Sequence, residues 1–182
     1  EIVTAEQPEA PDYFVHDAIL NRQDRDSLHD TMQGSVKPLS LDEVVAHQRD
    51  DGQVVDVRDA SEFAGAHLVG SINIGIDGKY ATWCGTVLDK EKPIVVVAED
   101  GREEEAIMRL GRIGFDNVQG YLQHGPNALA PRPDLVGTVN RITANALAER
   151  LSEANSPLVV DVRSKAEWEA GHVEGSTNIP LN

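Results

Sequence analysis

The sequence is poor in cysteine and in aromatic side chains, and it has no long apolar run. Cys84 is the single cysteine among 182 residues, so no disulfide can form within the chain, which suits the reducing cytoplasm. Aromatic residues make up only 4 %, so we expect a core of Val, Leu, Ile and Ala. No stretch approaches the roughly 18–20 apolar residues of a transmembrane helix, and no signal peptide is recognisable. The length fits one or two ordinary domains of a cytoplasmic protein.

Positive charge is also scarce. The chain has 16 Lys and Arg against 31 Asp and Glu, a formal net charge of −15. Nucleic acids and anionic membranes are bound through cationic surface, so we expect neither as a partner. The charge alone indicates no substrate.

A segment of twenty residues occurs twice. Val55–Ile74 reads VDVRDASEFAGAHLVGSINI, and Val160–Ile179 reads VDVRSKAEWEAGHVEGSTNI, at a constant offset of 105 residues. Ten of the twenty positions are identical. This period is too long for a solenoid repeat and has the length of a domain, so we expect two copies of one domain.

Each copy shows the same order of expected elements. A helix comes first, after Ser40 with Glu43 in capping-box spacing, and again after Thr143. A short apolar run then predicts a buried strand, at 54–57 and at 158–162. The first copy continues with expected strands at 71–76, 93–97 and 117–121, and a helix at 102–113 that ends at Gly114. Strands alternating with helices indicate an α/β fold with a parallel sheet flanked by helices.

The two copies differ in completeness. Gln123–Arg141 is rich in Pro and Gly and is expected to be a linker. The second copy stops at Asn182, before the counterparts of the later strands and the last helix, so we expect one complete copy and one truncated copy. A shortened form or a proteolytic fragment would explain this, and the unpaired sheet edge makes a homo-oligomer possible. The predicted domains are 1–37, 38–122, a linker at 123–141, and 142–182.

The repeated motif of Asp-Val-Arg, Glu plus an aromatic residue, His, Gly and Asn-Ile resembles the rhodanese superfamily. The resemblance covers roughly Pro38–Leu122 and again Ile142–Asn182. It implies a parallel sheet flanked by helices, and sulfur transfer through a cysteine persulfide.

The N-terminal segment 1–37 resembles something else. Pro11-Asp12-Tyr13-Phe14, Asp17-Ala18 and Leu20-Asn21-Arg22 are similar to the C-terminal end of a metallo-β-lactamase-fold domain of the persulfide dioxygenase type. The resemblance implies that a metal centre lies upstream, and we expect no cofactor in this chain. Its histidines lie singly, without ligand spacing: His16, His29, His47, His67, His124 and His172.

The rhodanese resemblance also implies where a nucleophile belongs. The family places a cysteine directly after an apolar strand, with Gly and Arg just beyond, because a thiolate needs backbone N–H groups at a helix N-terminus. Here the strand is followed by Ala98, which occupies the cysteine's place, and then by Glu99, Asp100, Gly101, Arg102 and Glu103. A methyl group cannot carry sulfur, so we expect no catalytic residue and a vestigial active-site loop.

The loop is crowded with carboxylates, which would repel a thiosulfate or persulfide anion. Asp100 and Glu103 have capping-box spacing, so an ordinary acidic helix start is the favoured interpretation, against a residual site for a small anion at Arg102. Cys84 has no cationic neighbour within four residues to lower its pKa, and we expect it to be a small buried side chain.

The repeated residues are predicted to be structural. Arg58 and Glu62 are four residues apart, as are Arg163 and Glu167, which suits a salt bridge across one helical turn. Asp56 and Asp161 are expected to cap the turn after a strand. His67 and His172 recur in both copies and are expected to be scaffold. Phe63 and Trp168 are predicted core residues, and Gly70 and Gly175 turn residues.

Three functional hypotheses remain. The chain could be a non-catalytic module that positions an upstream metallo-β-lactamase-like domain against the downstream remainder of the second rhodanese copy. It could be an acidic interaction or regulatory domain. The parent protein could instead be an active sulfurtransferase whose cysteine lies in the missing half of the second copy. We expect no catalysis by this chain itself, and an enzyme of sulfide or persulfide metabolism as the parent.

Overall fold

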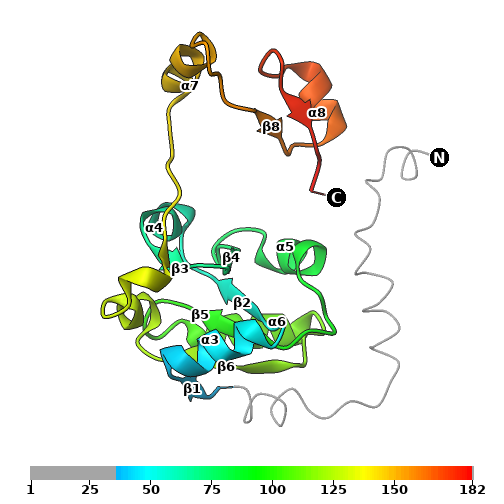
Figure 1. Ribbon diagram of the computed structural model, residues 1–182. Helices are drawn as coiled ribbons and strands as arrows, with labels where there is room; N and C mark the ends of the chain where they lie inside the picture. Colours follow the sequence, from blue (N-terminus) through cyan, green and yellow to red (C-terminus); the bar gives the residue numbers. More distant parts are fainter. Residues whose placement is uncertain (1–35, 182) are drawn as a thin grey trace, which may run out of the picture. The chain divides into compact units, whose positions relative to one another are not determined.

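The computed structural model describes residues 36–181 and divides the chain into two compact units (Figure 1). Unit 1 extends to Val139, and unit 2 begins at Asn140. The segment 1–37, predicted to end an upstream domain, lies almost entirely outside the described residues. Among residues 36–181, no helix is long and apolar enough to cross a membrane.

Unit 1 is built on a five-stranded parallel sheet, which confirms the predicted α/β fold. Every neighbouring pair of strands is parallel. In spatial order the strands are β1 (Pro38–Leu39), β6 (Val118–Leu122), β5 (Ile94–Val97), β2 (Gln53–Asp56) and β4 (Ile72–Asn73). β5 and most of β2 are buried, as expected for the centre of a sheet covered on both faces.

Successive residues of β2 and β5 point to opposite faces of the sheet and contribute to two hydrophobic clusters. On one face, Val55 and Val96 pack with α5 (Tyr80–Val87) and α6 (Glu103–Arg112). On the other face, Val54 and Val95 pack with Val44 of α3 (Leu41–Arg49) and with Leu129. The core is mostly Val, Leu and Ile, with Tyr80 and Phe115 as its largest buried side chains.

Helix ends follow the sequence signals. At the start of α3, the Glu43 N–H donates to Ser40 Oγ, and the Ser40 N–H donates to Glu43 Oε2 at 2.8 Å, which confirms the capping box. At the end of α6, Gly114 has φ 84°, and the Phe115 N–H donates to the Leu110 carbonyl at 3.1 Å. This is the Schellman arrangement, in which glycine adopts the left-handed conformation.

Residues 123–141 do not form the predicted linker. Most of them fold with unit 1, as two short 3-10 helices, η1 (Gly125–Leu129) and η2 (Pro133–Leu135), and the strand β7 (Val136–Gly137). β7 pairs antiparallel with β3 (His67–Leu68), and Leu129 is buried in the core. The Pro and Gly residues therefore shape a packed return over the sheet, not a free connection.

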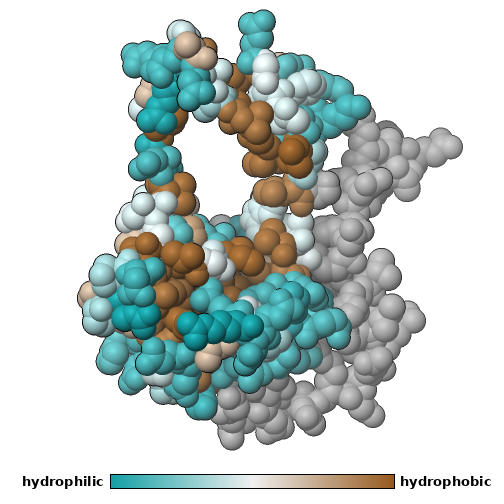
Figure 2. Space-filling view, in the orientation of Figure 1, coloured by the Kyte–Doolittle hydropathy of each residue, from teal (hydrophilic) through white to brown (hydrophobic). Residues whose placement is uncertain are grey.

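Unit 2 repeats the first elements of unit 1. They are α7 (Ala144–Leu151), β8 (Val160–Asp161), α8 (Lys165–Ala170) and β9 (Thr177–Asn178). β8 pairs in parallel with β9, Val160 opposite Thr177, as Val55 lies opposite Ile72 in unit 1. No residue from 140 to 181 is buried, and Figure 2 shows apolar side chains at the surface near β8 and β9.

Candidate functional site

The carboxyl ends of β2, β4 and β5 meet at one edge of the sheet in unit 1. In parallel α/β sheets this is the edge at which ligands bind. A small cavity of about 50 Å³ lies there. Its polar lining comes from the loops after these three strands: Arg58, Asp59, Asp77, Glu99 and Arg102. The fold thus places the expected active-site loop beside a cavity at the edge of the sheet where ligands bind in parallel α/β folds.

Ala98, at the start of this loop, belongs to the hydrophobic core and not to the cavity. It is fully buried and packs in the cluster beneath α5 and α6, beside Val96 and Ala106, and it does not line the cavity. Its carbonyl lies against Gly125, where a Cβ atom would come within 2.3 Å of the carbonyl oxygen. The start of the loop is therefore fixed by packing on both sides.

Two backbone N–H groups of the loop donate hydrogen bonds to acceptors within the same loop and the start of α6. The Gly101 N–H donates to Glu103 Oε2 at 2.7 Å, and the Arg102 N–H donates to the Glu99 carbonyl at 3.0 Å. Arg102 is the N-cap of α6 and no side chain caps the helix, so the predicted capping box of Asp100 and Glu103 is wrong. Glu103 reaches back to the turn at Gly101 instead, because Gly101, with φ 89°, presents its N–H there.

Arg102 is neutralised by two carboxylates. Its Nη1 and Nη2 donate to Asp77 Oδ2 and Oδ1, both at 2.8 Å, and Nη2 also lies 3.0 Å from Glu105 Oε2. The hydrogen bonds with Asp77 and Glu105 raise the pKa of Arg102, and Arg102 lowers the pKa of Asp77. Asp77 is a site residue that was not predicted from the sequence. Its position just after the β4 segment could have indicated it, because the ends of β4 and β5 share one edge of the sheet.

A pair of carboxyl groups lies on the other side of the loop. Glu62, on α4 (Ala60–Gly65), is hydrogen-bonded to the Glu99 side chain. This hydrogen bond is the largest cause of the raised pKa of Glu62, and partial desolvation and the negative charge of Glu99 raise it further. The predicted salt bridge between Arg58 and Glu62 is wrong, because Arg58 pairs with Asp56. Together with Glu103 and Asp77, this pair makes the loop's surroundings anionic.

Asp56 and Arg58 form a buried ion pair beneath the cavity. Arg58 Nη2 lies 2.6 Å from Asp56 Oδ2 and 2.9 Å from the Ala66 carbonyl, and Asp56 Oδ1 also accepts the Arg58 N–H, as predicted for a turn cap. Asn73 Nδ2 donates to the carbonyls of Asp56 and Arg58 at 3.0 and 2.9 Å. The network ties β2, β4 and the end of α4 together, and it frames the cavity.

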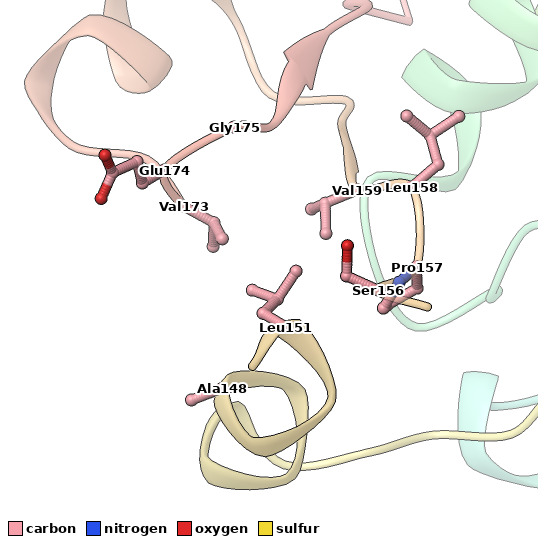
Figure 3. A pocket seen from close by; sticks show the side chains of 9 residues that line it. All are labelled: Ala148, Leu151, Ser156, Pro157, Leu158, Val159, Val173, Glu174 and Gly175. Atoms are coloured by element: carbon pink, nitrogen blue, oxygen red, sulfur yellow. The ribbon is translucent and has the colours of Figure 1, made fainter. Parts of the chain in front are cut away.

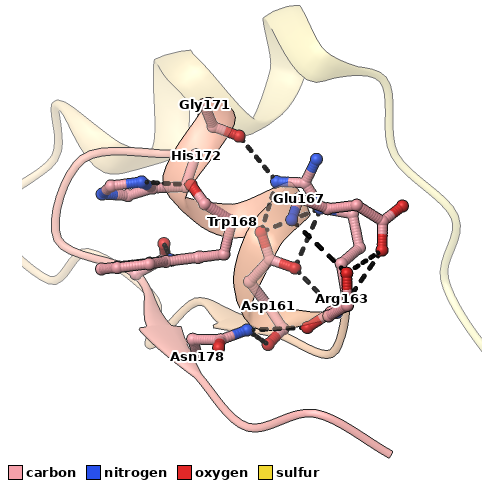
Figure 4. Close-up of polar contacts among 9 residues, drawn as sticks. Asp161, Arg163, Glu167, Trp168, Gly171, His172 and Asn178 are labelled. Carbon is pink, nitrogen blue, oxygen red and sulfur yellow. Dashed lines mark hydrogen bonds and ion pairs between the residues drawn. The ribbon is translucent and has the colours of Figure 1, made fainter. Parts of the chain in front are cut away.

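Unit 2 contains the same network 105 residues later (Figure 4). Arg163 Nη2 lies 2.6 Å from Asp161 Oδ2 and 2.8 Å from the Gly171 carbonyl, and Asn178 Nδ2 donates to the carbonyls of Asp161 and Arg163. The predicted pairing of Arg163 with Glu167 does not form, because Glu167 caps α8 through Ser164. Arg163 is 47 % exposed, against 6 % for Arg58, so the network does not need burial to form.

The two repeated histidines make the same contacts. His67 Nδ1 lies 2.7 Å from the Phe63 carbonyl, and His172 Nδ1 lies 2.8 Å from the Trp168 carbonyl. Each ring is stacked on the aromatic ring four residues before it, with centroids 3.8 Å apart. Phe63 and Trp168 were predicted to be core, but both are only half-buried, because their rings cover the histidines at the surface.

One known protein family matches this sequence. The family profile of the rhodanese-like domain matches residues 40–128 and 143–182, more than half of the chain. The chain belongs to the rhodanese-like family. The two matched segments lie in units 1 and 2, and no curated protein matches the sequence.

Solved structures with rhodanese-like folds are similar to this chain. The Rhodanese_3-like domain of the Alr3790 protein from Anabaena sp. is 22 % identical and covers 51 % of this chain and 98 % of its own, with a TM-score of 0.46. The C412S variant of EanB in complex with hercynine is 16 % identical and covers 81 % of this chain and 41 % of its own, with a TM-score of 0.50. At these identities the comparison concerns the fold alone.

The one thiol of this rhodanese-like chain does not line the cavity. Cys84 is fully buried on α5, in the cluster between α5, α6 and the sheet. Burial raises the pKa of Cys84 to about 12. A thiol in this environment stays protonated at neutral pH and is a poor nucleophile.

Residues 36–181 contain no side-chain cluster of the kind that holds a metal ion. In that part of the chain, no three His, Cys, Asp or Glu side chains lie together as a metal site would require. His16 and His29 lie outside the described residues. His47 Nε2 contacts the Gln53 carbonyl at 3.1 Å, and His124 is exposed in the left-handed conformation before η1.

Proposed function

We propose that unit 1 is a non-catalytic rhodanese-like domain, with a structural or interaction role in a larger protein of sulfur or persulfide metabolism. One observation carries the proposal: the residue that follows β5, where the family resemblance implies a cysteine, is Ala98. Sulfur transfer needs a thiolate that attacks the sulfur donor and holds the sulfur as a persulfide. The buried Cys84 offers no substitute.

The charges around the loop support the same proposal. The Gly101 N–H and both arms of the Arg102 guanidinium are engaged by Glu103, Asp77 and Glu105. An incoming thiosulfate would have to displace carboxylates that belong to the same chain. The loop therefore resembles an anion cradle that is closed by its own acidic side chains.

A thiosulfate:cyanide sulfurtransferase assay tests the proposal. In this reaction a thiolate takes the outer sulfur of thiosulfate and releases sulfite, and the persulfide then passes its sulfur to cyanide, which leaves as thiocyanate. We expect background rates from the wild type and from Cys84→Ser. We expect no more than trace turnover from Ala98→Cys, because the new thiol would be buried in the hydrophobic cluster under α5 and α6.

Two outcomes would contradict this account. Wild-type turnover that is lost in Cys84→Ser would make Cys84 the sulfur carrier and overturn the proposal. Rapid turnover by Ala98→Cys would show that the missing cysteine alone prevents sulfur transfer. It would also show that the carboxylates do not close the loop to anions. Intact protein mass before and after thiosulfate treatment would detect a persulfide directly.

The match over residues 143–182 favours a second candidate. In this alternative, unit 2 is the start of a second rhodanese-like domain, and the downstream remainder of that domain carries the catalytic cysteine. The same assay on a longer protein, with each of its cysteines replaced in turn, separates the two candidates. A catalytic second domain is compatible with a silent unit 1.

The wider setting is also a proposal. The resemblance of segment 1–37 supports an upstream metallo-β-lactamase-like domain of the persulfide dioxygenase type, which would hold the metal, while this chain holds no cofactor. The family match begins at residue 40 and does not reach that segment. We propose a cytoplasmic location for the parent protein because Cys84, the single cysteine of this chain, is a free thiol. The net charge of −15 supports an acidic interaction domain as a further alternative.

A further inference from the structure

Residues 138–143, the connector, join the two units. They belong to no helix or strand, and every one of them is exposed. The boundary between the units, after Val139, falls within the connector. No backbone hydrogen bond joins residues 140–142 to any other part of the described chain, 36–181. These three residues can therefore take up an extended conformation without breaking a backbone hydrogen bond.

The chain is anchored on both sides of residues 140–142. Before them, the Val139 N–H donates to the Ala64 carbonyl at 2.8 Å, which holds the end of unit 1 at α4. After them, Thr143 is the N-cap of α7, and its Oγ1 accepts the Ala146 N–H at 3.2 Å. The free stretch is thus short and begins and ends at defined contacts.

α7 belongs to unit 2 together with the segment that follows it. Its Leu151 points toward Val159 and Val173, and the three side chains line one cavity of unit 2 (Figure 3). All of these residues lie beyond the connector. A break in the peptide chain at residues 140–142 therefore removes no contact within either unit.

Arg141 is the only charged residue between positions 135 and 148 of this acidic chain. Its side chain is exposed, and no ion pair holds it within the described residues 36–181. Endoproteases of trypsin-like specificity accept a basic side chain in a pocket that contains a carboxylate. Their substrates bind in an extended form, through main-chain hydrogen bonds of the kind made in strand addition. The connector offers both features at one peptide bond, Arg141–Ile142.

The other basic residues of the described chain lack this combination. Three of them precede proline, which has no N–H and a fixed φ and so makes a poor extended substrate: Lys37, Lys92 and Arg132. Five lie in helices: Arg49, Arg109, Arg112, Arg150 and Lys165. Three are held in ion pairs with carboxylates: Arg58, Arg102 and Arg163.

The two remaining lysines lie against the core of unit 1. Lys90 is half-buried, with its Nζ 5.4 Å from the centroid of the Phe115 ring. Lys79 is exposed, but the next residue is the fully buried Tyr80, and the Lys79 carbonyl accepts the Trp83 N–H at 3.0 Å. Cleavage after either lysine requires part of the core to open first.

We propose that the Arg141–Ile142 bond is a site of limited proteolysis, at which an endoprotease specific for basic residues separates the two units. One water molecule is consumed. Its hydroxyl adds to the carbonyl carbon of Arg141, its proton goes to the nitrogen of Ile142, and at neutral pH the new ends are a carboxylate and an ammonium group. Unit 1 then ends just after its anchor at Val139, and unit 2 begins just before the cap of α7. The cut uncouples the units and leaves both folded.

Limited digestion of the intact chain with trypsin, followed by intact-mass measurement, tests the proposal. Among residues 36–181 we expect the first cut after Arg141, which releases a fragment of residues 142–182. In a Trp168→Phe background, Trp83 fluorescence should give the same urea midpoint for unit 1 before and after this cut. A first cut after any other Lys or Arg of residues 36–181, or a lower midpoint after the cut, would overturn the proposal.

Three variants complete the test. Arg141→Gln should slow the separation of the units by about a hundredfold or more, because the specificity pocket loses its charged partner. Ile142→Pro keeps the arginine and should block the cut to a similar extent. Arg150→Gln is the matched control, since it removes an exposed arginine from α7, and it should leave the rate unchanged.

Separation of the units at the wild-type rate in Arg141→Gln would contradict the assignment of the site. A rate that falls equally in Arg150→Gln would also contradict it, because the loss would then follow net charge and not the connector. Sulfurtransferase activity has no part in these readouts, so this proposal and the proposed function fail independently.

Discussion

Two glycines of unit 1 both have a positive φ but lie in different surroundings. Gly101 has φ 89° with open space where a Cβ atom would lie. Gly125 has φ 50°, and a Cβ atom there would come within 2.3 Å of the Ala98 carbonyl oxygen. The first position needs glycine only for its conformation, whereas the second also needs it for a close approach between η1 and the end of β5.

This difference predicts unequal effects of alanine. Gly101→Ala should cost about 1 kcal/mol of unfolding free energy, from backbone strain alone. Gly125→Ala should cost about 3 kcal/mol or more, because strain and a clash with backbone add together. Urea denaturation in a Trp168→Phe background, followed by Trp83 fluorescence, measures both losses. Equal losses in the two variants would show that the contact between Gly125 and Ala98 is unimportant.

At the scale of elements, α4 and α8 occupy matching positions and begin differently. α8 has the full capping box of Ser164 and Glu167, and the hydrogen bonds from Ser164 lower the pKa of Glu167. α4 begins at Asp59, whose carboxylate accepts the Ser61 N–H. Glu62 turns to Glu99 instead, and its pKa is raised. The same glutamate of the repeated motif thus has a different partner in each unit.

The shifts predict opposite responses to pH. The folded state binds the Glu62 proton more tightly than the unfolded state does, so the pair with Glu99 costs stability at neutral pH. That cost fades as the pH falls from the raised pKa of Glu62 to the ordinary pKa of a glutamate. Glu62→Gln should therefore increase stability slightly at pH 7 and have little effect near pH 4.

Glu167→Gln is the matched control for this prediction. The pKa of Glu167 is lowered, so its ionised form stabilises α8 at neutral pH, and this contribution is lost as the pH falls through the lowered value. The substitution should reduce stability at pH 7. Thermal unfolding of both variants across pH 4–7 makes the comparison, and a loss of stability in Glu62→Gln at pH 7 would contradict it.

Most elements could be predicted from local signals, and the contacts of the candidate site could not. Capping-box spacing gave the start of α3, apolar runs gave β2 and β5, and Gly114 gave the end of α6. α5 was missed, since Cys84 and Tyr80 are the only residues it buries and no cap or periodic stripe announces it. Asp77 lies 25 residues from its partner Arg102, and Glu99 lies 37 residues from its partner Glu62, so no local pattern could indicate either contact.

At the scale of the whole molecule, the two units differ in what they bury. Ile74 is 5 % exposed in the cluster under α5 and α6, and its counterpart Ile179 is 56 % exposed. The same side chain at matching positions of the motif is therefore core in unit 1 and surface in unit 2. Each unit also contains one tryptophan, Trp83 or Trp168, so the two can be followed separately.

Alanine at these positions should have unequal effects. Ile74→Ala should destabilise unit 1 by about 2–5 kcal/mol, because it leaves a cavity in a packed core. Ile179→Ala should change the stability of unit 2 by no more than about 0.5 kcal/mol. Denaturation of Trp83→Phe and Trp168→Phe backgrounds reports each unit alone, and we expect unit 2 to unfold at the lower urea concentration. A single transition shared by both reporters would contradict this expectation.

The polar network of unit 2 closes over a short stretch of chain. From Asp161 through Arg163 and Gly171 to Asn178, every partner lies within seventeen residues of the next. Contacts so close in sequence form quickly, because closing a short loop costs little conformational entropy. During synthesis, when the N-terminal part of a domain emerges first, such a segment can take up its strand-helix-strand form while later residues are still in the ribosome. The motif shared by both units would then act as a template, laid down early, on which the central strand of each sheet is later placed.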